Sequence, residues 1–205
     1  MQRMHLYAAA AAASLAIPAQ AQDFGIMQSA ETIEPGNYKL AGYPFFVFGE
    51  DGADDETGAV VRGGYGFTPT IDGELKAAFF DDVTYLGADA EFLLHDSAPL
   101  DVSLTLGANI GMADEPLSDS TTFDAALSGS HALTRRLELV GSIEAAFVEL
   151  DDVPPGADDS LRPVHLVPGV EYRLTETVDL VAEYGFEVND EGADYGSIGL
   201  AVYFL

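Results

Sequence analysis

Two histidine–serine pairs are the residues of this sequence that come closest to a nucleophile with its general base. His95 stands two positions before Ser97, a spacing that some hydrolases use, and Ser130 directly precedes His131. Ser130 and His131 cannot cooperate in a strand, because adjacent residues of a strand point to opposite faces. The first pair lacks a carboxylate at an interval that would orient the histidine, and Asn109 stands near the place where one is needed. We therefore expect that this protein is not an enzyme.

Metal binding is the second kind of chemistry to consider. The four histidines are scattered and the chain has no cysteine, so it lacks the clusters that hold zinc. Two acidic runs offer the oxygen ligands that Ca²⁺ prefers. They are Asp51, Asp54, Asp55 and Glu56 in the first run, and Asp151, Asp152, Asp158 and Asp159 in the second. Neither run has EF-hand spacing, and acidic loops also keep a surface solvated. We expect no cofactor, with loop-bound Ca²⁺ at the first run as the alternative.

A larger set of charged residues alternates with apolar ones. In residues 178–188, for example, one parity holds Val178, Leu180, Ala182, Tyr184, Phe186 and Val188, and the other holds Asp179, Glu183 and Glu187. This period of two places the charges on one face of a strand. The charge network that we predict on this face consists of Arg62, Lys76, Asp89, Glu91, Asp101, Glu138, Glu144, Glu171, Arg173, Asp179, Glu183 and Glu187, with Glu74 and His165 at the same parity. Because acids outnumber bases in this set, the bases should pair with carboxylates, and the surplus acids should need water or cations.

The elements that position these residues are strands. Period-two alternation predicts ten of them, at residues 37–49, 58–68, 73–80, 84–94, 100–111, 121–132, 137–149, 164–174, 178–188 and 195–205, of which 37–49 and 121–132 alternate poorly. Two kinds of connection alternate along the chain. The short ones are at 69–72, 95–99, 133–136 and 175–177, and the acidic ones are at 50–57, 81–83, 114–120, 151–162 and 189–194. The acidic connections are longer, except for 81–83. Together these patterns predict an all-β fold, a closed antiparallel up-and-down transmembrane β-barrel of about eight to ten strands.

The beginning of the chain has the features of a signal peptide. Arg3 precedes an apolar run at residues 6–17, and Ala19 and Ala21 form a cleavage site of the A-x-A type. The run is too short to span a bilayer comfortably, and no later stretch approaches the ~20 apolar residues of a transmembrane helix. We predict a signal peptide at 1–21, a polar leader at 22–36 and a barrel at 37–205.

Composition restricts the partners. The 35 Asp and Glu residues outnumber the 8 Lys and Arg residues, for a formal net charge of −27. Nucleic acids and anionic lipid surfaces are bound by clusters of Lys and Arg, so we exclude them as partners. The absence of cysteine leaves an exported chain without disulfides. Closure of a barrel would stabilise it without an unpaired strand edge, and we expect a monomer.

Three segments carry a family resemblance. Residues 197–205 look like the C-terminal signature of outer-membrane barrels, although Leu205 follows the aromatic Phe204. Residues 169–174 and 178–186 are similar to the penultimate hairpin of the OmpA-like and opacity-type small porin families, and residues 61–66 and 71–75 resemble a hairpin that is common in such proteins. The resemblance implies the outer membrane of a Gram-negative bacterium, contact with its lipid and lipopolysaccharide, and recognition of the last strand by the barrel-assembly machinery. Aromatic residues near the strand ends would form the interfacial girdles, namely Tyr65, Phe67, Tyr172, Phe186, Tyr195 and Phe204.

The resulting hypothesis is a surface or structural barrel with acidic external loops and a narrow charged lumen filled by ion pairs. A narrow cation-preferring porin and a soluble secreted β-barrel that binds a small ligand are the alternatives. A barrel lipase or lipid A deacylase is disfavoured, because His95 and Ser97 fall in a short turn on the periplasmic side, which is the wrong leaflet for lipid A. The leader at 22–36 either plugs the barrel or lies in the periplasm.

Overall fold

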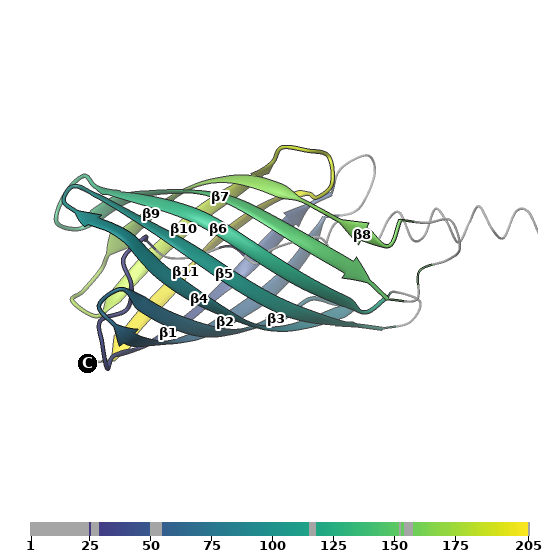
Figure 1. Cartoon of the computed structure of the whole chain (residues 1–205), viewed down its shortest axis with the longest axis horizontal. Helices are drawn as coiled ribbons and strands as arrows, with labels where there is room; N and C mark the ends of the chain where they lie inside the picture. The colour runs from purple at the N-terminus through teal and green to yellow at the C-terminus, as the bar shows by residue number, and fades with distance from the viewer. Residues whose placement is uncertain are drawn as a thin grey trace, which may run out of the picture.

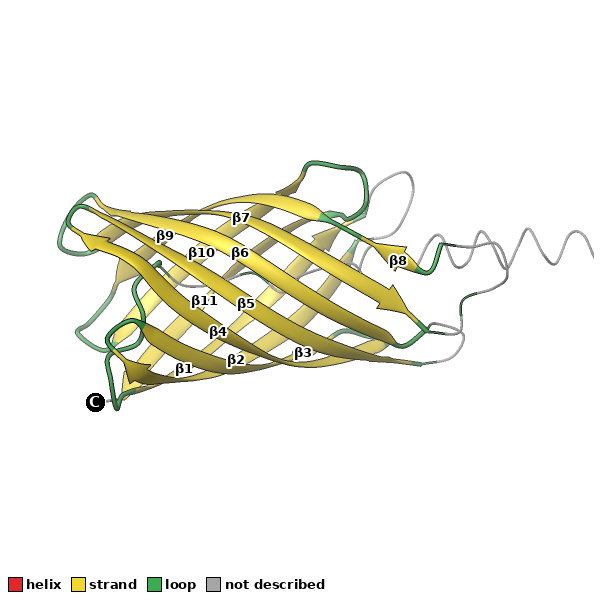
Figure 2. Ribbon diagram, in the orientation of Figure 1, coloured by secondary structure: helices red, strands yellow, loops and turns green. Residues whose placement is uncertain are grey.

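The computed structural model describes residues 25, 29–49, 55–114, 118–151, 153 and 158–204. These residues form eleven strands (Figures 1 and 2). The strands are β1 (Tyr38–Phe48), β2 (Glu56–Thr68), β3 (Ile71–Phe79), β4 (Val83–Ser97), β5 (Leu100–Ala113), β6 (Ser120–Ala132), β7 (Leu137–Leu150), β8 (Ser160–Leu161), β9 (Val164–Arg173), β10 (Val178–Glu187) and β11 (Asp194–Phe204). In the part of the chain described, there is no helix with the length and apolar character to cross a membrane.

The ten long strands close into an antiparallel barrel. Each pairs with its neighbours in the ring β1-β2-β3-β4-β5-β6-β7-β9-β10-β11, and β11 returns to pair with β1. The two-residue strand β8 stands outside this ring and pairs only with the end of β7, at Val148 and Glu149. Figure 2 shows the strands crossing the barrel wall obliquely. The predicted fold class is therefore confirmed, with ten strands in the wall.

The predicted strands correspond one to one with the long strands, and their ends differ by at most three residues. The largest difference is in β4, which continues through His95 and Asp96 to Ser97 and pairs there with the beginning of β5. The prediction that these three residues form a connection was wrong, because the turn consists only of Ala98 and Pro99. We call the end of the barrel with the turns at 69–70, 98–99, 133–136 and 174–177 the short-turn end, and the opposite end the long-loop end.

The strand β1 shows how alternation builds the wall. Its residues Lys39, Ala41, Tyr43, Phe45 and Val47 are buried in the barrel, and every residue between them is exposed on the outside. Because successive side chains of a strand point to opposite faces, one short sequence provides both the lining and the outer surface.

Large apolar side chains cover the outer surface. Leu75 is 71% exposed, Phe67 61% and Phe123 58%. Burying such a side chain is worth ~1.5–3 kcal/mol, and soluble monomers rarely expose extended apolar surface. The outer surface therefore requires apolar surroundings. Tyr195 departs from the predicted aromatic girdles, because it shares the inward parity of Ser197 and is fully buried in the lumen.

The lumen is filled in layers. Near the long-loop end lies an apolar cluster made of Tyr43, Phe45, Val47, Val60, Ala78, Val83, Tyr85, Val167, Val181, Ala193 and Tyr195. Most of the buried Asp, Glu, Lys and Arg side chains lie in the middle of the barrel and toward the short-turn end, whereas the buried Ser120 and His165 lie near the long-loop end. Residues 29–36 of the leader lie toward the short-turn end, drawn in dark purple in Figure 1.

Candidate functional site in the barrel lumen

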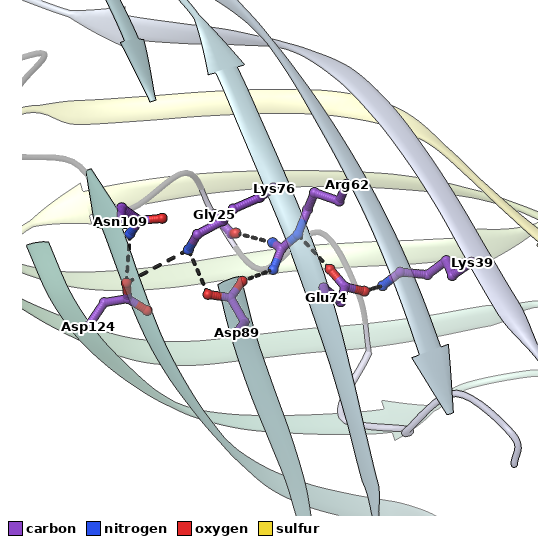
Figure 3. A network of polar contacts seen from close by, with 8 residues as sticks. All are labelled: Gly25, Lys39, Arg62, Glu74, Lys76, Asp89, Asn109 and Asp124. Atoms are coloured by element: carbon purple, nitrogen blue, oxygen red, sulfur yellow. Dashed lines mark hydrogen bonds and ion pairs between the residues drawn. The ribbon is translucent and has the colours of Figure 1, made fainter. Parts of the chain in front are cut away.

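A network of ion pairs occupies the middle of the lumen (Figure 3). Its centre is the guanidinium group of Arg62 on β2, whose Nε lies 2.6 Å from Glu74 Oε2 and whose Nη2 lies 2.5 Å from Asp89 Oδ2. Glu74 on β3 also pairs with Lys39 of β1. All four side chains are at most 4% exposed. The forked guanidinium group thus joins two carboxylates that come from different strands.

The network continues toward β6. Lys76 Nζ lies 2.8 Å from Asp89 Oδ1 and 3.7 Å from Asp124 Oδ1. Asn109 Nδ2 of β5 donates to Asp124 Oδ1 at 2.8 Å. The contacts therefore run without interruption across six neighbouring strands, β1 to β6.

Charge balance explains why these groups can be buried. Lys39, Arg62 and Lys76 are matched by the carboxylates of Glu74, Asp89 and Asp124. A buried charge without a partner is costly, and a complete set of partners offsets most of that cost. The strand register places Arg62 directly opposite Lys76, and Glu74 directly opposite Asp89. Like charges in direct opposition repel, so the favourable pairs form along the diagonals.

The leader enters the lumen next to β2 and β3. Pro35 forms a bridge with Gly66, and a side chain at Gly66 would overlap the backbone of Ile33 and Glu34. Gly66 therefore permits the close approach of the leader to the wall. Further inward, the backbone N–H of Ile33 donates to Asp72 Oδ2 at 2.7 Å.

The leader then crosses to the opposite wall. The backbone N–H of Ser29 donates to Glu171 Oε2 on β9 at 3.1 Å, and β9 stands five strands away from β3 in the ring of ten. In the middle of the barrel, Arg62 Nη1 donates to the carbonyl oxygen of Gly25 at 2.5 Å. Figure 3 shows this carbonyl group beside the ion-pair network. Of the two positions open for the leader, the structure has the one inside the barrel.

Aromatic side chains fill the lumen nearer the long-loop end. Phe45 of β1 stacks on Tyr195 of β11, with ring centroids 4.8 Å apart. The Tyr195 hydroxyl donates to Glu144 Oε2 at 2.8 Å, and His165 Nε2 lies 3.0 Å from the carbonyl oxygen of Ala193. These contacts connect β1 and β11 with β7 and β9, so this layer spans the barrel.

The structure places the predicted charge network in three groups. Fully buried in the lumen are Arg62, Glu74, Lys76, Asp89, Glu91, Glu144, His165, Glu171 and Asp179, and partly buried are Asp101, Glu138, Glu183 and Glu187. Arg173 is an exception, because its side chain is 48% exposed. It is the last residue of β9, so its long side chain reaches solvent at the short-turn end, 3.7 Å from Asp179 Oδ1.

Three charged residues of the lumen were missing from the prediction. Lys39 and Asp124 belong to the two segments that alternate poorly, and Asp72 was assigned to a connection, whereas it is the second residue of β3. All three are buried. Because the predicted network already held more acids than bases, charge balance gave no signal for Asp124.

The predicted calcium runs lie partly outside the described residues, so loop-bound Ca²⁺ stays a prediction. Asp51 and Asp54 lie outside the described residues, as does Asp152 of the second run. Asp55 Oδ1 accepts the backbone N–H of Gly49 at 3.0 Å and so ties the two ends of its loop together. Glu56 is the first residue of β2.

In each histidine–serine pair, the two described side chains do not contact each other. Ser130 is buried in the lumen and His131 is exposed, so the two side chains lie on opposite faces as expected. His95 and Ser97 are both exposed at the end of β4. Within the described residues no hydrogen bond joins His95 to Ser97.

The fold and the apolar outer surface define the class of a transmembrane β-barrel. The chain belongs to the family described as outer membrane protein beta-barrel domain, whose model matches residues 7–204. The protein is therefore an outer-membrane barrel with a porin-like fold, and the soluble alternative was wrong. No curated protein matches the sequence.

Solved structures of other barrels are similar to this one. An outer membrane channel from Pseudomonas putida F1 has 10% sequence identity and a TM-score of 0.61, with 89% of this chain and 100% of that chain covered. A bacterial polysaccharide outer membrane secretin has 13% identity and a TM-score of 0.51, with 82% and 66% covered. The KdgM porin has 7% identity and a TM-score of 0.46, with 82% and 99% covered. At these identities, the likeness concerns the fold alone.

Proposed function

We propose that this protein is a structural barrel of the outer membrane whose lumen is closed in its resting state. The observation that carries the proposal is the leader, which is held across the lumen by Asp72 on one wall and Glu171 on the other. Its innermost described residue, Gly25, is bound by Arg62, and two carboxylates fix the position of Arg62 in turn. A chain segment held at both walls and at the centre leaves little space for a solute to pass.

The proposed orientation follows from the loops. In outer-membrane barrels the short turns face the periplasm and the longer loops face outward. The leader would then enter from the periplasm after cleavage of the signal peptide, and the acidic loops would face the exterior and its lipopolysaccharide. Strand β11, which closes the barrel by pairing with β1, would be the segment that the assembly machinery recognises. We infer a monomer, because closure leaves no strand edge free.

A narrow cation-preferring porin is the second candidate. It is favoured by the surplus of acids toward the short-turn end, where Asp72, Glu91, Glu171 and Asp179 are all buried. For conduction, the leader and the aromatic layer around Phe45 would have to move. The neighbouring structures support neither the presence nor the absence of an enzymatic activity.

Planar bilayer recording tests the closed lumen. The mature protein, extracted from the outer-membrane fraction, should be silent after insertion, and its gel mobility should change on boiling, as expected of a folded barrel. Insertion is verified in vesicles by protection of the barrel from protease. Stable conductance of the wild-type protein, at a level above that of detergent alone, would contradict the proposal and favour the porin.

A further inference from the structure

Three carboxylates meet at the short-turn end, outside the ion-pair network described above. Glu31 belongs to the leader, Asp101 to the beginning of β5 and Glu138 to the beginning of β7. One oxygen atom from each lies within 4.8 Å of the others, and in the described chain this is the one group of three potential ligands that approach so closely. None of the three carboxylates accepts a hydrogen bond or forms an ion pair with another described residue.

The charges in this cluster are not balanced. Glu31 is an exposed residue, and Asp101 and Glu138 are half-buried. Partial desolvation of the Glu31 carboxyl group and the negative charges of Glu138 and Asp101 raise the pKa of Glu31, and Arg173 offsets only part of this effect. Arg173 is itself half exposed, with Asp179 as its ion-pair partner at 3.7 Å. Arg135 and Arg136 line the cavity beside Glu31 and Glu138, but in the described structure neither forms an ion pair with the three carboxylates. Holding the leader in this position therefore brings together negative charges that lack a directly bound counter-ion.

A buried hydroxyl group points to what the counter-ion is. Ser130 on β6 is 1% exposed, and its Oγ has no hydrogen-bond partner in the described structure. The register sets Ser130 directly opposite Asp101, and Ala132, two residues along the same face, directly opposite Glu138. Opposed side chains lie ~5 Å apart on the same face, so the Ser130 side chain lies on the lumen face beside Asp101, and Glu138 is one inward position further along β7. An oxygen atom that lacks a partner at this place is suited to a metal ion.

We propose that Glu31, Asp101 and Glu138 bind one Ca²⁺ ion, with the Ser130 hydroxyl as a further ligand, and that this ion fastens the leader to β5 and β7. Ca²⁺ takes six to eight oxygen ligands at about 2.3–2.6 Å in flexible geometry, so two of its ligands can be nearly 5 Å apart. The separations in the cluster satisfy this condition. Water can supply the remaining ligands from a cavity of about 470 Å³ that Glu31 and Glu138 line.

The ion would complete the closure of the lumen, and in this respect the inference rests on the proposed function. The contacts of Ser29 and Ile33 hold the leader to β9 and β3. The calcium site would add β5, and also β7, which is the neighbour of β9 in the ring. Removal of the ion would restore the repulsion among the carboxylates and release this part of the leader.

Calorimetric titration of the folded, mature barrel with CaCl₂ in detergent tests the site. Glu138→Gln and Asp101→Asn should each weaken the affinity of the proposed lumen site for Ca²⁺ by at least about tenfold. Glu176→Gln is the matched control, because Glu176 is an exposed carboxylate in the turn at 174–177, outside the lumen. Each variant is first checked for the change in gel mobility on boiling. If neither lumen variant alters the binding of Ca²⁺, then calcium binds at the acidic loops or not at all, and the proposal is wrong.

The position of the leader provides a second readout. The chain has no cysteine, so Ser29→Cys introduces a single thiol at a buried position of similar size. A maleimide–polyethylene glycol reagent should label this thiol several times more slowly in Ca²⁺ than in EDTA, and Glu138→Gln should abolish the difference. Equal labelling rates in a protein that binds Ca²⁺ would overturn the fastening role. A wild-type barrel that is silent in bilayers but does not bind Ca²⁺ contradicts this inference alone, whereas one that conducts and binds Ca²⁺ at the cluster contradicts the closed lumen alone.

Discussion

Arg62 is the residue on which the interior most depends. It contacts Glu74, Asp89 and the carbonyl group of Gly25, and it is 2% exposed. Each carboxylate keeps one lysine partner without it, but neither lysine can replace the fork of a guanidinium group. Arg62 therefore holds together strands of the wall and also binds the leader. Its replacement should affect both the stability of the barrel and the binding of the leader.

We expect Arg62→Ala to lower the free energy of unfolding by ~3–5 kcal/mol, since it leaves buried carboxylates with incomplete partners. Arg62→Lys should have an intermediate effect, because it keeps the charge and loses the fork. Urea unfolding in lipid vesicles, followed by the gel mobility of unboiled samples, measures the difference. Arg135→Ala, in an exposed turn, is the control. Equal midpoints for Arg62→Ala and the wild type would show that the network contributes nothing to stability.

At the level of the elements, most of the barrel could be predicted because each strand repeats one physical pattern. Alternation identifies β10 from residues 178–188 alone, since all of its large apolar residues except Val181 share one parity. The same reasoning weakens in β1 and β6, where small residues and aromatic lining blur the parity, so Lys39 and Asp124 were missed. The position of Tyr195 was missed because an aromatic residue near a strand end suits either face. β8 was missed because it is two residues long and depends on β7 rather than on its own sequence.

The leader could not be placed from the sequence, because it has no periodicity and makes its contacts through backbone groups. Its N–H groups at Ser29 and Ile33 and its carbonyl group at Gly25 are the atoms that bind the wall. Every residue type offers the same backbone carbonyl group, and all except proline offer the same N–H group, so the sequence does not reveal these contacts.

Deletion of residues 23–34 should leave the barrel folded, because the ring of strands and the network from β1 to β6 are complete without the leader. The leader-deleted protein should therefore keep its change in gel mobility on boiling. Its urea midpoint should fall by less than that of Arg62→Ala, since a typical hydrogen bond contributes only about 0.5–1.5 kcal/mol. A deletion variant that fails to fold, while Arg62→Ala folds, would mean that the leader acts as part of the core.

For the whole molecule, the charge of the lumen determines what the barrel would conduct if it were opened. The buried acids of the lumen are Asp72, Glu74, Asp89, Glu91, Asp124, Glu144, Glu171 and Asp179, and the buried Lys and Arg residues are Lys39, Arg62 and Lys76. The three bases lie on neighbouring strands, β1 to β3, and three of the acids neutralise them. Of the remaining acids, Asp72 and Glu91 lie on β3 and β4, and Glu144, Glu171 and Asp179 lie on β7, β9 and β10. A narrow pore with this surplus attracts cations and repels anions.

The opened barrel should therefore prefer K⁺ over Cl⁻. We expect conductance when the deletion of residues 23–34 is combined with Phe45→Ala and Tyr195→Ala, because these changes remove the leader and the stacked pair of the aromatic layer. The reversal potential in a KCl gradient measures the preference, which should fall when Glu171→Gln and Asp179→Asn are added. The effect should be larger at low salt, where charges are screened less. An opened barrel with no preference, or with a preference for Cl⁻, would show that water or bound cations already neutralise the surplus acids.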